Sequence, residues 1–203
     1  MKNKKNAELK IIVNNIHQSV DVVRSLLNEV PHIQKLARVF LTTIERGGKI
    51  LTAGNGGSAA EALHMAEELV GRFKHNRIAL PAIALVADCT AITCIGNDYG
   101  FDMIFSRQIE ALGRKGDLLA LFSTSGKALN LQQAAQTARK LGMKTVCFLG
   151  RDGGPLLKMA DYAIVVTNLS TERIQEAHLV LIHLILDIIE TKFSNTEGKK
   201  APS

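Results

Sequence analysis

A histidine and a glutamate stand four residues apart just after a glycine-rich turn, and they are the strongest chemical signal in the chain. The turn covers 54–58, and His64 and Glu68 follow it in a segment with helical spacing of apolar residues. Side chains four residues apart leave the same face of a helix. An imidazole and a carboxylate paired in this way can bind a metal ion or move a proton. The alternative is an ordinary ion pair on a helix surface.

The turn at 54–58 has the composition of an anion-binding loop. It follows an apolar run at 49–53, which predicts a buried strand, and it opens the helix that carries His64. Glycine lets a ligand approach the backbone, and a helix start presents free N–H groups. The turn also matches the G-x-G-x-x-A pattern of dinucleotide-binding loops, but the first acid after the next predicted strand, Asp88, stands well beyond the required spacing. We favour a phosphate group as the anion, because a second anion-binding loop is predicted to converge on this one.

A second loop, rich in hydroxyl groups, is predicted to face the first. Ser123, Thr124 and Ser125 stand between an apolar strand and a helix. Hydroxyl groups together with helix N–H groups suit a phosphate monoester, whereas an ordinary helix cap would explain only one of the three. If the strand order is 2-1-3-4-5, the loops after strands one and three meet where the winding reverses, which is where such sheets bind ligands.

Five apolar runs and the segments between them indicate the elements that position these loops. Strands are predicted at 49–53, 82–87, 118–122, 145–149 and 162–166. Helices are predicted at 7–28, 31–46, from 59 onward, 101–112, 129–141 and 172–193, with a short turn at 156–159. Continuous apolar strands that alternate with helices are typical of a parallel sheet covered on both faces.

These elements predict one α/β domain over 1–203, built on a five-stranded, parallel, doubly wound sheet. Two helices within 1–46 precede the core at 47–193, and a polar tail at 194–203 is expected to be disordered. Two helices ahead of the first strand are more than one sheet needs as cover. They either cap the domain or pack on copies of themselves in an oligomer.

Composition argues against nucleic-acid and membrane roles. The net charge is +6, but the basic residues are scattered and many lie in the tails; aromatic residues make up 4% and there is no tryptophan. The longest apolar run, at 179–189, is interrupted by His183 and Asp187 and is too short to span a bilayer. Cys89, Cys94 and Cys147 lack CxxC spacing, so we expect small buried residues in a reducing cytoplasm.

The last predicted helix carries three further polar candidates, Gln175, His178 and His183. At about 100° per residue, the two histidines fall about 140° apart and cannot serve one site. Gln175 and His183 are separated by about 80° and by about 12 Å along the axis. Sharing one metal ion would require long side-chain reach, a bent helix start or a second copy of the chain.

Motifs along the chain resemble those of the bacterial phosphoheptose isomerases, the sedoheptulose 7-phosphate isomerases of the sugar-isomerase (SIS) family. The motifs occur in family order, within a match over 36–190, and they read GNGGSAAEALHMAEELVGR, IGNDYGF, STSGKALN and RIQEAHLVLIH. The resemblance implies a five-stranded α/β domain of flavodoxin-like strand order. It also implies a homotetramer with sites at subunit interfaces, and a zinc ion.

The resemblance assigns roles to individual residues. The implied zinc ligands are His64, Glu68, Gln175 and His183. The implied substrate contacts are Asn55, Gly56, Gly57, Glu68, Arg72, Asn97, Asp98, Ser123, Thr124, Ser125 and Gln175. Glu68 would be the base and His183 the acid in a cytoplasmic aldose–ketose isomerisation, from sedoheptulose 7-phosphate to D-glycero-D-manno-heptose 7-phosphate through an enediol. That product would feed ADP-heptose and lipopolysaccharide synthesis.

The chain departs from the family pattern at a few positions. Ala128 replaces a phosphate-binding serine, and Glu172 stands where an aspartate is expected, whereas Ala59 and Ala60 in place of His-Cys are read as tolerated variation. Two other functions are compatible with a SIS-type scaffold. A non-catalytic scaffold that binds a replication initiator would lack the carboxylate that Glu68 supplies here, and a sugar-phosphate sensor would carry a DNA-binding extension that we do not find.

Overall fold

The computed structural model describes residues 2–194, and it describes side chains from residue 6 onward. All but the first residue of the tail predicted to be disordered, 194–203, lies outside the described residues.

The five strands form one parallel sheet in the order β2-β1-β3-β4-β5, as predicted. Their bounds are Ile50–Gly54 (β1), Ala82–Ala84 (β2), Leu118–Ser123 (β3), Lys144–Gly150 (β4) and Tyr162–Val166 (β5). The second strand is shorter than the predicted 82–87. The chain bends because the Ala87 N–H donates to the Ala84 carbonyl, which turns it away from the sheet edge.

Helices separate the strands, and several bounds differ from the prediction. The α-helices are Lys2–Ser25 (α1), Val30–Glu45 (α2), Gly57–Val70 (α3), Cys89–Tyr99 (α4), Ser106–Leu112 (α5), Leu129–Lys140 (α6), Gly154–Met159 (α7) and Thr171–Phe193 (α8). A 3₁₀ turn, Leu26–Glu29 (η1), ends the first predicted helix. The helix predicted at 101–112 is divided into a 3₁₀ turn, Phe101–Met103 (η2), and α5.

Helix α4 was not predicted, because nothing on it is buried. Asp88 caps its start by accepting the Ala91 N–H, yet none of its residues lies in the core. The expectation of three buried cysteines was therefore wrong for two of them. Cys89 and Cys94 lie exposed on α4, whereas Cys147 on β4 is buried.

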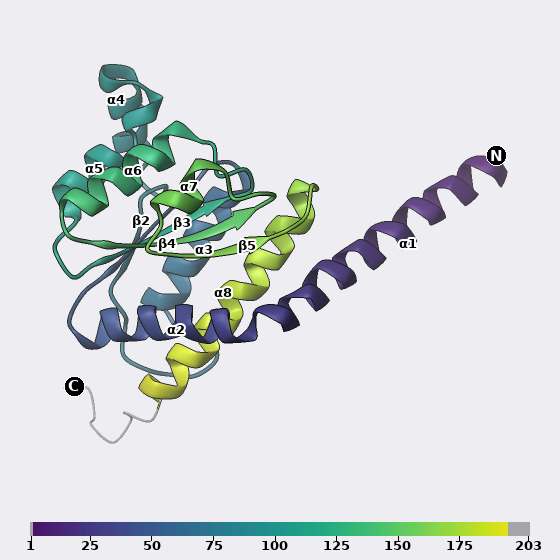
Figure 1. The fold of residues 1–203 in the computed structure, drawn as a ribbon, viewed down its shortest axis with the longest axis horizontal. Coiled ribbons are helices and arrows are strands. Elements are labelled where there is room, and N and C mark those ends of the chain that lie inside the picture. The colour runs from purple at the N-terminus through teal and green to yellow at the C-terminus, as the bar shows by residue number, and fades with distance from the viewer. Residues whose placement is uncertain (1, 195–203) are drawn as a thin grey trace.

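Helices cover both faces of the sheet (Figure 1), and each face packs an apolar cluster against them. Helices α2, α3 and α8 pack against one face, which Phe122 and Phe148 fill. Helices α5, α6 and α7 cover the other face, where the alternate residues Leu121 and Leu149 point. This alternation holds the carboxyl ends of β1, β3 and β4 at one rigid edge.

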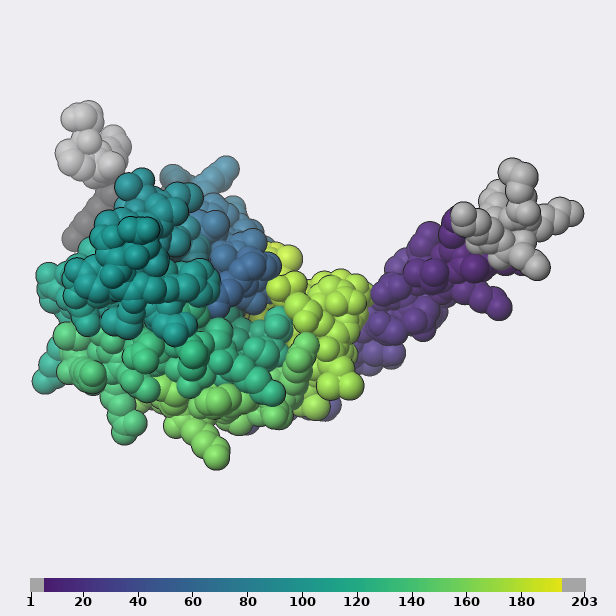
Figure 2. All heavy atoms as spheres, turned by 90° about the horizontal axis from the view of Figure 1, so that it is seen from above, coloured from purple at the N-terminus to yellow at the C-terminus, as the bar shows by residue number. Residues whose placement is uncertain are grey.

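Helix α1 leaves this compact body and projects as a free arm (Figures 1 and 2). Its second half is tied to α8, because Arg173 donates to the Asn15 carbonyl and to the Ser19 hydroxyl. Much of its apolar surface is exposed, at Leu9, Ile11, Ile12, Val13, Ile16 and Val20. Among the described residues, no helix is long and apolar enough to cross a membrane.

Candidate metal centre and phosphate loops

Two histidines that are distant in sequence meet where α3 crosses α8. The Nε2 atoms of His64 and His183 lie 3.0 Å apart, and the rings stand edge to face with centroids 5.3 Å apart. Two imidazole ligands of one tetrahedral zinc ion would have nitrogens about 3.4 Å apart, given Zn–N bonds of about 2.1 Å. The pair therefore fits a shared metal ion within one chain, without help from a second copy.

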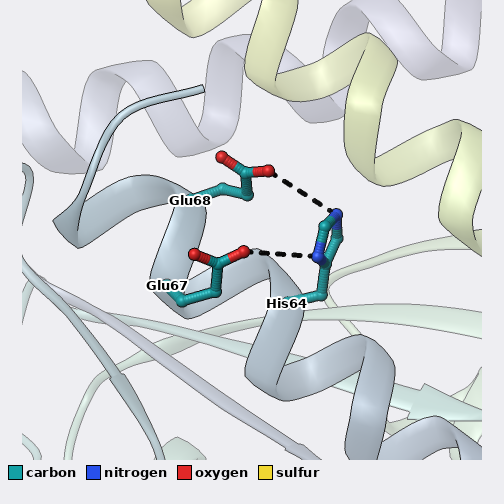
Figure 3. A group of neighbouring side chains, drawn as sticks. All are labelled: His64, Glu67 and Glu68. Carbon is teal, nitrogen blue, oxygen red and sulfur yellow. Dashed lines mark ion pairs between the residues drawn. The ribbon is translucent and has the colours of Figure 1, made fainter. Parts of the chain in front are cut away.

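Two carboxylates flank His64 on the same helix (Figure 3). Glu68 Oε1 lies 3.8 Å from Nε2, and Glu67 Oε1 lies 3.4 Å from Nδ1. One ligand atom from each of these three residues falls within 4.8 Å of the others. Sequence reasoning missed Glu67, although its spacing of three from His64 was a usable signal. Its side chain is 64% exposed, against 16% for Glu68, so Glu68 is the carboxylate turned toward the protein.

The surroundings shift the proton affinity of both proposed acid–base groups. Burial raises the pKa of Glu68, and the neighbouring charge of Glu67 raises it further. Burial lowers the pKa of His183, and the nearby imidazole of His64 adds to the effect. Both pKa shifts favour the uncharged form of the side chain. This suits a carboxylate that accepts a proton and an imidazole that exchanges one.

Gln175 reaches the same region from the first turns of α8. It lines a hollow of about 490 Å³ together with Gly57, His64 and Glu172. A Cβ atom added at Gly57 would lie only 2.3 Å from Gln175 Nε2, so the amide rests directly on the glycine. The four predicted metal ligands thus come from two crossing helices. His64 lies between the other candidates, since it contacts His183 and shares the hollow with Gln175.

The two predicted phosphate loops are neighbours at the carboxyl edge of the sheet. Gly54, the last residue of β1, pairs in register with Phe122 of β3, so the loops begin side by side. Two of the three hydroxyls organise their own loop: Ser123 Oγ accepts the Gly126 N–H, and Ser125 Oγ accepts the Lys127 N–H. Each still has an O–H to donate, and Thr124 is half-buried beside them.

Asn55 and Asn130 connect the two loops through a reciprocal pair of amide hydrogen bonds. Each side-chain nitrogen donates to the other's oxygen at 2.9 Å, and Asn130 is almost fully buried. Asn55, predicted as a substrate contact, therefore keeps one N–H and one lone pair free for a ligand. Asn130 was not predicted, because an asparagine in the first turn of a helix has no distinctive local pattern.

The structure does not bring the remaining predicted contacts to this cluster. Asn97 and Asp98 are exposed on α4, and their described side-chain contacts are with each other and with Cys94. Arg72 is exposed just after α3, with no side-chain hydrogen bond or ion pair among the described residues. Gly56 is exposed at the helix start with a φ of 57°, a conformation that suits glycine.

A buried network beside the cluster was invisible in the sequence. Arg77 donates to the carbonyls of Glu68 and Leu69 at the end of α3, and its Nε lies 3.5 Å from Glu190 Oε1. Glu190, on α8, accepts the backbone N–H groups of three successive residues, 73–75. This holds Phe73 so that its ring stacks on His183 with centroids 5.4 Å apart. The network fixes the end of α3 against α8.

The fold and the site together define the class of the protein. The family model of the SIS domain matches residues 14–150. A solved phosphoheptose isomerase from Francisella tularensis superposes with a TM-score of 0.88 at 36% identity, over 91% of this chain and 98% of that chain. The five-stranded order, the glycine turn and the hydroxyl loop thus belong to a SIS-domain protein.

Curated relatives narrow this class. A phosphoheptose isomerase of Pelobacter propionicus is 48% identical over 160 residues, which cover 79% of this chain and 85% of the relative. One of Burkholderia pseudomallei is 44% identical over 188 residues, which cover 91% and 95%. The chain therefore belongs to the phosphoheptose isomerase family, and it is an enzyme. The resemblance inferred from the sequence motifs is confirmed.

Proposed function

We propose that this enzyme interconverts sedoheptulose 7-phosphate and D-glycero-D-manno-heptose 7-phosphate, with a zinc ion at the crossing of α3 and α8. The observation that carries the proposal is the 3.0 Å approach of His64 Nε2 to His183 Nε2 beside the carboxylate of Glu68. A structural histidine pair would need neither a partly buried carboxylate 3.8 Å from His64 Nε2 nor a hollow that His64 shares with the amide of Gln175.

His64, Glu68, Gln175 and His183 would hold the zinc ion, which supplies positive charge that polarises the two reacting oxygens when it is bound. Nitrogen and carboxylate donors of this kind are ordinary zinc ligands. Glu68 cannot act as a free base while it is fully engaged as a ligand, so its two roles would alternate.

Glu68 would take the proton from C1 of the ketose, and the resulting enediol would be reprotonated at C2. The raised pKa of Glu68 makes it a better proton acceptor than an exposed glutamate. The lowered pKa of His183 keeps its imidazole neutral near pH 7, so it can pass a proton between the two oxygens of the enediol. Phe73, stacked on this ring, limits its orientation.

The hydroxyl loop after β3 would hold the phosphate group. Ser123, Thr124 and Ser125 offer O–H groups there. Asn55 and the glycines at 56 and 57 would contact the sugar. Anchoring the far end of a seven-carbon chain places its reactive end at a fixed distance, which lowers the entropic cost of the reaction.

We further propose a homotetramer whose sites are completed at subunit interfaces. The exposed apolar face of α1 supports this, because a projecting helix with this surface is marginal in water unless something packs on it. The isolation of Asn97 and Asp98 on α4 also supports it. If these two residues bind substrate, the rest of their site would have to come from a neighbouring subunit. The exposed free thiols of Cys89 and Cys94 suit a reducing cytoplasm.

The reaction is tested by incubating the purified enzyme with sedoheptulose 7-phosphate, with and without a chelator. We expect aldose product, loss of turnover on chelation and recovery when zinc is restored. A scaffold or a sensor would give no product in either tube. Product that persists unchanged after complete metal removal would refute the zinc assignment and leave the reaction standing.

The assembly is tested separately by placing charges on the arm. Ile12→Glu together with Ile16→Glu would put carboxylates into the proposed interface, so we expect light scattering to show a smaller particle. A matched Asn14→Glu variant on the same helix adds charge without removing an apolar residue. An unchanged particle in the double variant would show that α1 does not form the interface.

A further inference from the structure

Below the proposed zinc ligands, a second polar pair joins the same two helices. Glu61, on α3, is 7% exposed, and His178, on α8, is completely buried. The carboxylate oxygen Oε2 lies 3.5 Å from the imidazole Nδ1. This separation is within ion-pair range but longer than an ordinary hydrogen bond. The two residues have no part in the reaction described above.

The surroundings of His178 fix its ring and aim Nδ1 at Glu61. Its Nε2 lies 3.1 Å from the carbonyl oxygen of Leu149, at the end of β4. Phe122 and Phe148 meet the ring edge to face, at centroid distances of 6.2 and 6.3 Å. The imidazole therefore cannot turn without losing a hydrogen bond and two aromatic contacts.

Packing alone does not account for this pair. Among the described residues, neither oxygen of Glu61 nor Nδ1 of His178 has a hydrogen-bond partner. Buried polar groups are nearly always paired, and replacing a buried ion pair with apolar residues is often neutral or stabilising. A leucine at this position would serve the core at least as well, so the retained polar pair calls for another reason.

The position of the pair supplies that reason. Glu61 stands one helical turn before His64 on α3, and His178 stands one turn after Gln175 on α8. The described polar side-chain contacts that join α3 directly to α8 are this pair and the pair His64–His183. A metal ion bound by His64 and His183 would replace their direct contact. Glu61–His178 would then be the direct polar contact between the two helices at the level of the site, apart from the Arg77–Glu190 network at the end of α3.

We propose that Glu61 and His178 are positioning residues for the metal centre. Their mutual attraction sets how closely α3 approaches α8, and so holds His64 and His183 at the separation that one ion requires. The inference rests on the proposed zinc function. Residues behind metal ligands commonly affect metal affinity about 10- to 100-fold, because they fix the ligands' orientation.

The test measures zinc affinity of the full chain by competition with a chromophoric chelator, alongside thermal unfolding. Glu61→Leu fills the space without a charge, and we expect zinc to bind about 10- to 100-fold more weakly with thermal stability retained. Glu61→Gln keeps a polar group that can reach Nδ1, and we expect it to stay within about threefold of the original affinity. This rescue is not expected from a merely space-filling role.

The matched control is Asp117→Asn, which alters another buried carboxylate, one whose described partners are Lys49 and Arg114 rather than residues of α3 or α8. Asp117 is 5% exposed and pairs with Lys49 at the opposite end of the sheet, so this variant should lose stability and keep its zinc affinity. If Glu61→Leu fails to fold, His178→Phe fills the imidazole site between Phe122 and Phe148 and carries the same expectation. Unchanged zinc affinity in the folded variant would overturn the proposal.

A second readout separates this inference from the function on which it rests. In the metal-free protein labelled with ¹⁵N-histidine, Glu61→Leu should shift the imidazole signals of His64 and His183, whereas Asp117→Asn should not. If the unmodified protein binds no zinc, the proposed metal is refuted. The positioning role is then judged by whether the imidazole signals of His64 and His183 shift in Glu61→Leu. Signals of His64 and His183 that do not move in Glu61→Leu would refute that role.

Discussion

Two regions carry predicted site residues, and they differ in how those residues are placed. One is the crossing of α3 and α8, and the other is helix α4. At the crossing, one chain brings His64 and His183 to within 3.0 Å of each other. On α4, Asn97 and Asp98 are exposed and bond to each other rather than to the rest of the predicted site. The residues expected to do the chemistry are assembled within one chain, whereas Asn97 and Asp98, two of the expected substrate contacts, lie apart from them there.

Packing explains the difference. Helix α8 carries a row of fully buried side chains, including Leu181 and Ile185, that lock it onto the sheet and onto α3. Helix α4 has no fully buried residue and touches the core only through the partly buried Ile92 and Ile95, so its polar side chains at 97 and 98 stay on the exposed side. Reactive groups need tightly held positions, and a rigid core provides them.

The largest expected effect comes from removing the acid or the base at the crossing. Glu68→Gln and His183→Gln should each lower kcat at least about 10³-fold, because the first removes the carrier of the proton between C1 and C2 and the second removes the carrier between the two enediol oxygens. Steady-state kinetics with sedoheptulose 7-phosphate and thermal unfolding would measure activity and folding together. A folded variant with an unchanged rate would show that the crossing is not the reactive end.

A smaller effect is expected on α4. Asp98→Ala should lower kcat/KM about 10- to 100-fold, the range for one lost hydrogen bond to a charged group. Its zinc affinity should stay unchanged, because Asp98 has no described contact with the metal candidates. Asp102→Ala, on the neighbouring 3₁₀ turn, is a suitable control. If zinc affinity fell with Asp98→Ala, the two regions would not be independent.

Restoring a hydroxyl in the phosphate loop should have a modest effect. Ala128→Ser places an O–H where the resemblance of the motifs leads us to expect one, and a neutral hydrogen bond would lower KM about two- to tenfold. Inhibition by inorganic phosphate should strengthen in proportion if the hydroxyl contacts the phosphate group. A KM that rises instead would mean that this loop holds the ligand in another orientation.

The smallest expected effect is on the pH dependence of stability in metal-free protein. Burial and His64 lower the pKa of His183 in the folded state below its ordinary value of 6.5. The unfolded chain then takes up a proton first as the pH falls, so stability declines from about pH 7 down through the folded pKa. His183→Gln should decline less between pH 7.5 and 5.5 in chemical denaturation. Equal slopes would contradict the shift.

The sequence was sufficient for the architecture and for the two loops, because continuous apolar strands and their hydroxyl- or glycine-rich ends are local patterns. It was insufficient for α4, because no side chain of this helix is fully buried and the segment therefore lacks a clear apolar face. It also left open whether Gln175 and His183 could share one site, since their separation along α8 does not reveal where α3 crosses it. The Arg77–Glu190 network follows from that crossing and has no local signature.

Gly57 determines where the amide of Gln175 can lie in the site. Because the amide of Gln175 lies where a Cβ would be, at 2.3 Å, even alanine would push the glutamine out of place. A library randomised at position 57 and selected for turnover should therefore return glycine alone. Its identity is dictated by a side chain more than a hundred residues downstream, so two stretches of the gene must change together or remain as they are.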